Sequence, residues 1–293
     1  MICPSTKFTN KLVLGGAQLG SNYGVTNNEG RRRTSEAMEI LELAWESGIR
    51  TFDTAPIYGS EQILGEFIAR NNLFAGVRVC TKIPKITKLD DHRKQILESI
   101  SRSKENLGLN QIFTLFFHHS PDARLLLSDP EFFSELVENQ STCKIGISLY
   151  EPCELELLRP YRSERAVQFP LSVVNRAFEY ETFGRTTSFA RSMFLQGVLL
   201  SGTTLDQRAP AALHKFRASY LGILSTKNIS PLTYALSYVR SKKTVDYFIF
   251  GVASKCQLTE VVNAGDCDFV ELPEVNKLFL EYEKTLFDPR RWY

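Results

Sequence analysis

The stretch FDTAPIYGSEQILGEF, from Phe52 to Phe67, decides the fold because it passes from a strand into a helix. IRTFD (49–53) is a short apolar run, and SEQILGEFIARNN (60–72) is a longer amphipathic one. Apolar residues spaced three and four apart predict a helix with one buried face. Asp53 therefore lies at the end of a strand, where a loop begins, and Tyr58 follows five residues later.

The same strand-then-helix unit recurs eight times along the chain. Strands are predicted at 11–16, 49–53, 77–83, 111–119, 143–148, 165–171, 189–200 and 246–252, and helical segments at 35–48, 60–72, 91–108, 129–140, 151–160, near 179–189, 230–243 and 254–265. Strands that alternate with helices are parallel and joined by right-handed crossovers, and eight such units can close into a barrel. The longest irregular stretch, 201–215, follows the seventh strand and is expected on the catalytic face.

An open doubly wound sheet is the alternative to a barrel. Such a sheet usually carries GxGxxG after its first strand. The glycines of GGAQLGSNYG (15–24) do not keep that spacing before a helix. We therefore predict an α/β protein with a single domain over residues 1–293, folded as a (β/α)8 TIM barrel.

Composition excludes several classes of protein. Apolar residues make up 43% of the chain and charged residues 23%, which are ordinary globular values. The formal charge of only +2 argues against nucleic acid as a main partner. Six cysteines without CxxC or CxxH spacing indicate free thiols in a reducing compartment. We find no signal-peptide pattern and no long apolar run, so we expect a cytoplasmic protein with no membrane partner.

Polar residues gather where the predicted strands end. Asp53 ends the second strand, Tyr58 lies in the loop after it, Lys82 ends the third strand, and His118 and His119 end the fourth. Each has an ordinary structural explanation alone, but closure of a barrel would bring them to one rim. A phenol has a pKa of about 10, and a nearby ammonium stabilises its phenolate. The set therefore describes a proton donor facing a carbonyl group.

Six separated segments, FDTAPIYGSEQILGEFI, CTKIP, LFFHHSP, IGIS, VQFPL and FGVASKCQLTEVV, resemble in order and spacing the motifs of the aldo-keto reductase superfamily. The resemblance runs from about residue 11 to about residue 265. It implies a (β/α)8 barrel that reduces carbonyl compounds with NADPH. The branch that this chain resembles is bacterial and often associated with sugar and surface-polysaccharide metabolism.

The resemblance also implies roles for individual residues. Tyr58 would be the general acid, Lys82 would lower its pKa, and Asp53 would pair with Lys82. The family pattern His-x-Pro selects His119, because Pro121 follows two residues later. Strand alternation lets only one of the two histidines point into the site, so the other, His118, is expected to point elsewhere.

Positions for the nicotinamide end of the cofactor follow from the same comparison. Ser148 and Gln168 match residues that hydrogen-bond the carboxamide, although the asparagine that usually follows the serine is Leu149 here. Arg191 stands where the family often has an aromatic ring on the nicotinamide, and Phe194 lies in the same motif. A planar guanidinium can also stack. An arginine paired with a surface acid is the alternative for Arg191.

The loop after the eighth strand matches the segment that holds the adenosine phosphates. It contributes Gly251 and Val252, and Glu260 matches a residue that contacts adenine. Where the family usually has an arginine that binds the 2′-phosphate, this chain has Gln257, and Lys255 is a nearby cation. The expected cofactor is NADP(H), with NAD(H) as the alternative.

The expected activity is reduction of an aldehyde or ketone, with a sugar or nucleotide-linked sugar as the first choice of substrate. A regulatory, non-catalytic member of the superfamily is one alternative. A metal-dependent hydrolase is another, but the chain has only four histidines and no HxH pair, so we expect no metal site. A monomer is the default oligomeric state.

Overall fold

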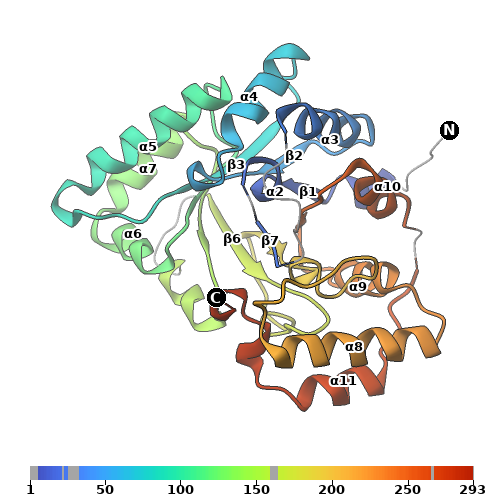
Figure 1. The fold of residues 1–293 in the computed structure, drawn as a ribbon. Coiled ribbons are helices and arrows are strands. Elements are labelled where there is room, and N and C mark those ends of the chain that lie inside the picture. Colours follow the sequence, from blue (N-terminus) through green and yellow to red (C-terminus); the bar gives the residue numbers. More distant parts are fainter. Residues whose placement is uncertain (1–5, 22, 26–32, 159–163, 265–266, 293) are drawn as a thin grey trace.

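Eight parallel strands form a closed barrel in the computed structural model, which describes residues 6–21, 23–25, 33–158, 164–264 and 267–292 (Figure 1). The strands follow one another around the barrel in chain order, and β8 pairs with β1 to close it. Their bounds are β1 Leu12–Gly15, β2 Thr51–Asp53, β3 Arg78–Ile83, β4 Thr114–Phe117, β5 Ile145–Ser148, β6 Arg165–Pro170, β7 Thr187–Arg191 and β8 Tyr247–Phe250. The predicted (β/α)8 barrel is confirmed.

Helices surround the barrel (Figure 1). The longer ones are α3 Thr34–Glu46, α4 Glu61–Arg70, α5 His92–Leu107, α7 Pro130–Glu138, α8 Ala211–Thr226, α9 Pro231–Arg240, α10 Lys255–Asn263 and α11 Pro273–Leu280, and the short ones are α1 Thr6–Thr9, α2 Ala17–Gly20 and α6 Leu125–Ser128. In α4, Ile63, Leu64, Phe67 and Ile68 are buried on one face, as the spacing predicts. None of the described helices is long and apolar enough to cross a membrane.

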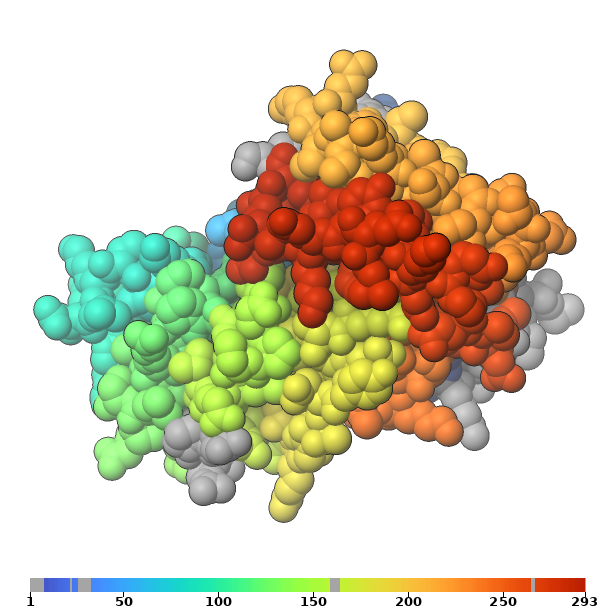
Figure 2. All heavy atoms as spheres, turned by 90° about the horizontal axis from the view of Figure 1, so that it is seen from below, coloured from blue at the N-terminus to red at the C-terminus, as the bar shows by residue number. Residues whose placement is uncertain are grey.

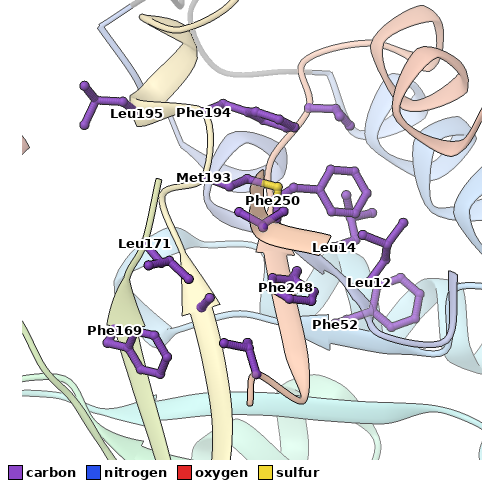
Figure 3. Packing of buried hydrophobic residues seen from close by; sticks show 14 of the residues in the cluster. Leu12, Leu14, Phe52, Phe169, Leu171, Met193, Phe194, Leu195, Phe248 and Phe250 are labelled. Atoms are coloured by element: carbon purple, nitrogen blue, oxygen red, sulfur yellow. The ribbon is translucent and has the colours of Figure 1, made fainter. Parts of the chain in front are cut away.

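Two apolar layers support the site. Figure 3 shows part of the larger one, in which residues such as Leu12, Phe52 and Phe248 lie in one cluster with the buried faces of the helices. The smaller cluster fills the inside of the barrel and consists of Val13, Cys80, Phe116, Ala166, Phe189 and Ile249. Side chains alternate along a strand. The residues two positions further on, namely Gly15, Lys82, His118, Gln168, Arg191 and Gly251, therefore form the next inward layer, at the carboxyl ends of the strands.

The seventh strand is shorter than predicted. The apolar run 189–200 was expected to be one strand, but β7 ends at Arg191. Ser192, Leu195 and Gln196 have φ angles of 63°, 47° and 53°, in the left-handed region. A strand cannot pass through that conformation, so the chain turns across the top of the barrel instead.

Two predicted helices are also absent as such. Residues 171–186 contain only turns and an isolated bridge, and the rings of Phe178 and Phe183 stack on Phe169 with centroids 4.8 Å apart in each case. These rings cover β6 where a helix was expected. The segment after β5 is a 3-10 helix, Pro152–Leu158, and the last two residues of its predicted range lie outside the described residues. In the stretch 201–215, the part from Ala211 belongs to α8.

The C-terminal segment packs on the molecule rather than extending from it. Figure 2 shows it in red, spread across one face of the protein beside the orange segment that contains α8. Trp292 is 4% exposed, and its indole Nε1 donates a hydrogen bond to the Leu286 carbonyl oxygen at 2.8 Å. This contact fixes the residues just before Trp292.

Candidate active site

A cavity of about 430 Å³ lies at the carboxyl ends of the strands. Its volume is in the range typical of sites for small molecules. Ten residues singled out from the sequence line it: Asp53, Tyr58, His118, Ser148, Gln168, Arg191, Phe194, Gly251, Val252 and Gln257. Lys82 lies beneath this surface, and the structure places His119 and Glu260 outside the cavity.

A buried ion pair forms the floor of the site. The Lys82 Nζ lies 2.7 Å from Asp53 Oδ2 and donates a second hydrogen bond to the Thr54 carbonyl oxygen at 2.8 Å. The other carboxylate oxygen, Oδ1, accepts a hydrogen bond from Gln168 Nε2 at 2.8 Å. Burial lowers the pKa of Lys82, but the Asp53 carboxylate and Tyr58 raise it by more, so the net pKa is above its ordinary value. Lys82 is therefore an ammonium group at neutral pH.

Tyr58 lies directly above this pair. It ends a short 3-10 helix, Pro56–Tyr58, and the Lys82 Nζ is 5.0 Å from the centroid of its ring. Burial raises the pKa of Tyr58, and the Lys82 ammonium opposes part of that rise. Lys82 thus lowers the pKa of Tyr58 as predicted, but the net pKa is raised, because loss of water around the phenol outweighs the lysine. The hydroxyl is thus protonated and can donate.

Backbone packing fixes the loop that carries Tyr58. A Cβ added to Gly20, at the end of α2, would lie 2.2 Å from the Tyr58 carbonyl oxygen and 2.5 Å from the carbonyl carbon of Gly59. Gly59 itself has a φ of 68°, which favours glycine. The two backbones touch only because Gly20 has no side chain, and the contact sets the position of Tyr58.

The histidine that faces the cavity is His118, whereas we expected His119. Phe116 points into the barrel, so His118, two residues on, also faces inward. The His118 ring lies 5.9 Å from the Tyr58 ring, at 85° to it. The His119 side chain is 40% exposed, and its Nδ1 lies 3.0 Å from Asp122 Oδ1. The prediction that His119 faces the site is therefore wrong.

His118 is neutral at neutral pH. Burial lowers its pKa to about 4, and the positive charges of Lys82 and Arg191 contribute to the same shift. A neutral imidazole has one N–H donor and one acceptor nitrogen. His118 can therefore donate a single hydrogen bond to an oxygen beside Tyr58.

The predicted nicotinamide residues lie around the same floor. Ser148 Oγ donates to Gln168 Oε1 at 3.3 Å, and both side chains are buried. Phe194 is buried in the wall formed by the loop after β7 (Figure 3). A Cβ at Gly251 would lie 2.2 Å from the amide oxygen of Gln18, another residue of the lining. The site thus presents hydroxyl and amide groups, and the absence of a side chain at Gly251 leaves space for the Gln18 amide.

The residues predicted to hold the adenosine end lie in and after the turn that follows β8. Gln257 Oε1 accepts a hydrogen bond from the Ala253 amide at 2.7 Å, so this side chain closes the turn between β8 and α10. Glu260 is exposed on α10 and lies outside the cavity, because it is one helical turn beyond Gln257. Lys255 forms an ion pair with Glu39 at 2.6 Å, in which both side chains are 53% exposed.

Arg191 contacts neutral groups rather than a surface acid. Its Nη2 donates to the Leu149 carbonyl oxygen at 2.9 Å and its Nη1 to Ser192 Oγ at 3.3 Å. The guanidinium lies 4.3 Å from the centroid of the Tyr150 ring. We did not predict a site role for Tyr150, although it follows the IGIS motif by two residues.

Tyr23 and Gln196 were also not predicted as site residues. They join the loop after β1 to the loop after β7, because Gln196 Nε2 donates to the Tyr23 hydroxyl at 3.2 Å. Gln196 has a left-handed φ of 53°, which is uncommon for a residue other than glycine and often marks a functional site. A backbone angle of this kind cannot be inferred from the sequence. Within the ranges that the structure describes, no three His, Cys, Asp or Glu side chains are grouped to hold a metal ion.

Known proteins share parts of this sequence. A D-threo-aldose 1-dehydrogenase of a Pseudomonas species is 31% identical over 135 residues, which are 36% of this chain and 39% of that protein. A proposed voltage-gated potassium channel subunit beta of Schizosaccharomyces pombe is 30% identical over 131 residues, or 40% of this chain and 37% of that one. The chain thus spans about two fifths of the length of these curated relatives.

Solved structures with the same fold cover the chain more fully. The holo form of an aldo-keto reductase from Bacillus halodurans has a TM-score of 0.69 at 18% identity and covers 96% of this chain and 95% of its own. A glycerol dehydrogenase from Gluconobacter oxydans has a TM-score of 0.68, also at 18% identity, over 92% and 90% of the two chains. The sequence model described as the aldo/keto reductase family matches residues 11–275, and the chain therefore belongs to the aldo/keto reductase family.

Proposed function

We propose that this protein reduces an aldehyde or ketone to an alcohol with a nicotinamide cofactor, and that Tyr58 is its general acid. One observation carries the proposal. A protonated phenol and a neutral imidazole, from Tyr58 and His118, face the same cavity above a buried lysine that is held by a carboxylate. A carbonyl oxygen needs a proton donor and a second hydrogen bond when it becomes an alkoxide.

The residues present fit the cofactor that the family uses. Buried hydroxyl and amide groups of Ser148 and Gln168 suit a carboxamide, and Phe194 offers an apolar wall. The same cavity extends to Gly251 and Val252 after β8, so it is long enough to connect the floor with the start of α10. When bound, the nicotinamide supplies the hydride.

The chain's own residues then transfer one proton to the carbonyl oxygen. Tyr58 donates its phenolic proton to the carbonyl oxygen, and His118 donates a hydrogen bond to that oxygen. The phenolate that remains is stabilised by the Lys82 ammonium, 5.0 Å from the ring centroid. Asp53 and the Thr54 carbonyl oxygen hold Lys82 in place. In the direction of alcohol oxidation, Tyr58 takes the same proton back.

NADP(H) is the cofactor that we propose, with NAD(H) as the alternative. Gln257 is committed to the Ala253 amide. Lys255 is therefore our candidate for the 2′-phosphate. Its partner Glu39 does not prevent this, because an exposed ion pair contributes little to stability and can exchange.

The proposed substrate is a sugar or a nucleotide-linked sugar. Support comes from the names of two proteins that this chain is similar to, an aldose dehydrogenase and a glycerol dehydrogenase, since both act on polyhydroxylated compounds. The cavity has ordered polar groups in its lining, which suits hydroxyl groups.

A regulatory role is the second candidate, and the similarity to a channel subunit favours it. Titration of the protein with NADPH and NADH, followed by an absorbance assay on aldehydes and keto-sugars, separates the two roles. Turnover would establish the reductase. Cofactor binding without turnover on any carbonyl compound would favour the regulatory role.

Tyr58→Phe tests the assigned acid. This variant should retain cofactor binding and lose reduction by a factor of roughly 10²–10⁴, the usual contribution of general acid catalysis. Its neighbour Ile57 is 65% exposed and lines the same cavity, so Ile57→Val is a matched control that should retain turnover. Turnover by Tyr58→Phe at the rate of the unmodified protein would eliminate Tyr58 as the acid.

A further inference from the structure

A second cavity adjoins the active site, and we propose that it binds a carboxylate or phosphate group carried by the carbonyl substrate. The cavity has a volume of about 410 Å³. It shares Tyr23, Tyr150, Arg191, Ser192 and Gln196 with the cavity that contains Tyr58 and His118. The inference rests on the proposed reductase function, because it describes the far end of the same substrate.

The second cavity extends away from the expected cofactor. None of the residues from Gly251 to Gln257 lines it, whereas four of them, Gly251, Val252, Ala253 and Gln257, line the first cavity. Its other walls come from the loop before α8 and from the C-terminal segment. A substrate with its carbonyl group at Tyr58 can therefore reach this cavity without crossing the cofactor.

The lining carries three arginines, of which Arg191 is the one without a carboxylate partner among the described residues. Arg191, Arg208 and Arg290 line the cavity, and Asp206 is the acidic residue among them. Asp206 is already held by Arg208, whose Nε donates to Oδ1 at 3.0 Å. Arg191 has no acidic partner among the described residues, since the groups that it contacts are the Leu149 carbonyl oxygen and Ser192. One guanidinium is thus available to an anion.

Tyr150 brings two of these arginines together. The Arg191 guanidinium lies 4.3 Å and the Arg290 guanidinium 3.6 Å from the centroid of its ring. Each cation is attracted to the ring, but the two positive charges repel each other. An anion close to both groups would offset that repulsion, and a guanidinium fork matches both carboxylate and phosphate oxygens.

The position of Arg290 is fixed before any ligand arrives. Its side chain forms a bidentate contact with Asp288, with Nε 2.9 Å from Oδ1 and Nη2 2.6 Å from Oδ2. Asp288 also caps the 3-10 helix Pro289–Arg291 by accepting from the Arg290 amide. The buried Trp292 follows directly and anchors the segment. A group that is already ordered loses little conformational freedom on binding.

The test compares pairs of substrates that differ only in the anionic group. D-glyceraldehyde is compared with D-glyceraldehyde 3-phosphate, and D-galactose with D-galacturonate, in wild type, Arg290→Gln and Arg291→Gln. Arg291 is the matched control, because it is the next residue, is 65% exposed and does not line the cavity. Arg290→Met, which is uncharged and of similar length, serves if Arg290→Gln fails to fold.

We expect the wild type to prefer an anionic member by about tenfold in kcat/KM, the effect of one charge-assisted hydrogen bond. Arg290→Gln should lose that preference and retain turnover of the neutral members, and Arg291→Gln should resemble the wild type. The two pairs show whether the group is a phosphate or a carboxylate. Equal kcat/KM for both members of each pair in the wild type would overturn the proposal, and so would weaker cofactor binding in Arg290→Gln, which would assign the cavity to the cofactor.

A binding measurement separates this proposal from the reductase function. If no carbonyl compound is turned over, the reductase function fails, and the cavity is tested with inorganic phosphate as the probe. Millimolar phosphate should raise the Tm of wild type and Arg291→Gln but not that of Arg290→Gln. An equal rise in all three proteins would overturn the anion site.

Discussion

Replacing Lys82 by methionine separates the structural from the chemical role of the buried ion pair. Lys82 is 1% exposed, and its ammonium contacts Asp53 at 2.7 Å. Methionine is close in length but uncharged, so the Asp53 carboxylate would retain only the hydrogen bond from Gln168. Removing one partner of a buried pair costs about 3–5 kcal/mol, because the remaining charge has no counterion.

The size of this effect can be checked by unfolding. At roughly 2–4 °C per kcal/mol for a chain of this size class, Lys82→Met should lower the Tm by about 6–20 °C. The double variant Lys82→Met with Asp53→Asn removes both charges and leaves an amide oxygen to accept from Gln168. It should recover a large part of the lost stability, because no buried charge remains unpaired.

Activity should not follow stability. Without the lysine, the phenolate of Tyr58 loses the ammonium group nearest its ring, so both variants should lose turnover by about 10²–10⁴. The assay is steady-state reduction at a temperature where all three proteins are folded. Two results would refute the reasoning: a double variant that is less stable than Lys82→Met, or a Lys82→Met protein that retains turnover within tenfold of the wild type.

Three further predictions concern the loop of Tyr58, the cofactor and His118. Gly20→Ala should lower kcat by tenfold or more while cofactor binding persists, because the added methyl group would displace the Tyr58 carbonyl from 2.2 Å away; unchanged kcat would show that the loop does not need this contact. Lys255→Ala should raise the Kd of NADPH about tenfold and leave that of NADH unchanged, as one phosphate contact predicts; parallel effects on both cofactors would exclude a role at the 2′-phosphate. His118, with a pKa of about 4 against 6.5 when unfolded, stays neutral in the fold, so its contribution to stability is present above pH 6.5 and is lost as the pH falls towards 4. His118→Gln should reduce this loss of stability by up to about 3 kcal/mol. Denaturant unfolding between pH 4 and 7 measures the effect, and a stability profile unchanged by the substitution would contradict it.

The sequence predicted the barrel because its signal is repeated and local. Each strand is a short apolar run, each helix has its own spacing, and eight repeats leave few possible topologies. The end of β7 was predicted wrongly because apolar residues alone do not show where a strand ends. The run 189–200 is mostly apolar and shows no break, but the strand ends at Arg191 because Ser192 adopts a left-handed φ of 63°. Phe194 is apolar because it is buried in the wall of the site, and Leu195 because it is buried in the larger core, rather than through strand pairing.

The choice between the two histidines required the register of β4. Leu115, Phe116 and Phe117 are all apolar, so the sequence does not show which of them faces into the barrel. The larger core takes Leu115 and Phe117, and the inner cluster takes Phe116. A shift of one residue reverses every side chain of a strand. A motif such as His-x-Pro fixes the distance along the chain to the proline, but it does not show which face of the strand the histidine lies on.

Substrate recognition depends on contacts that are distant in sequence. Tyr150 follows β5, Arg191 ends β7 and Arg290 lies three residues from the end of the chain, yet the three side chains stack together. No periodic pattern connects these positions, because each is placed by a different element: a strand end, a loop and a capped turn beside Trp292. The chemistry of the barrel is fixed by its strands and can be anticipated from motifs. The part that chooses a substrate is built from loops and the C-terminal segment, so similarity to relatives over two fifths of their length supports the reaction class more strongly than it supports any one substrate.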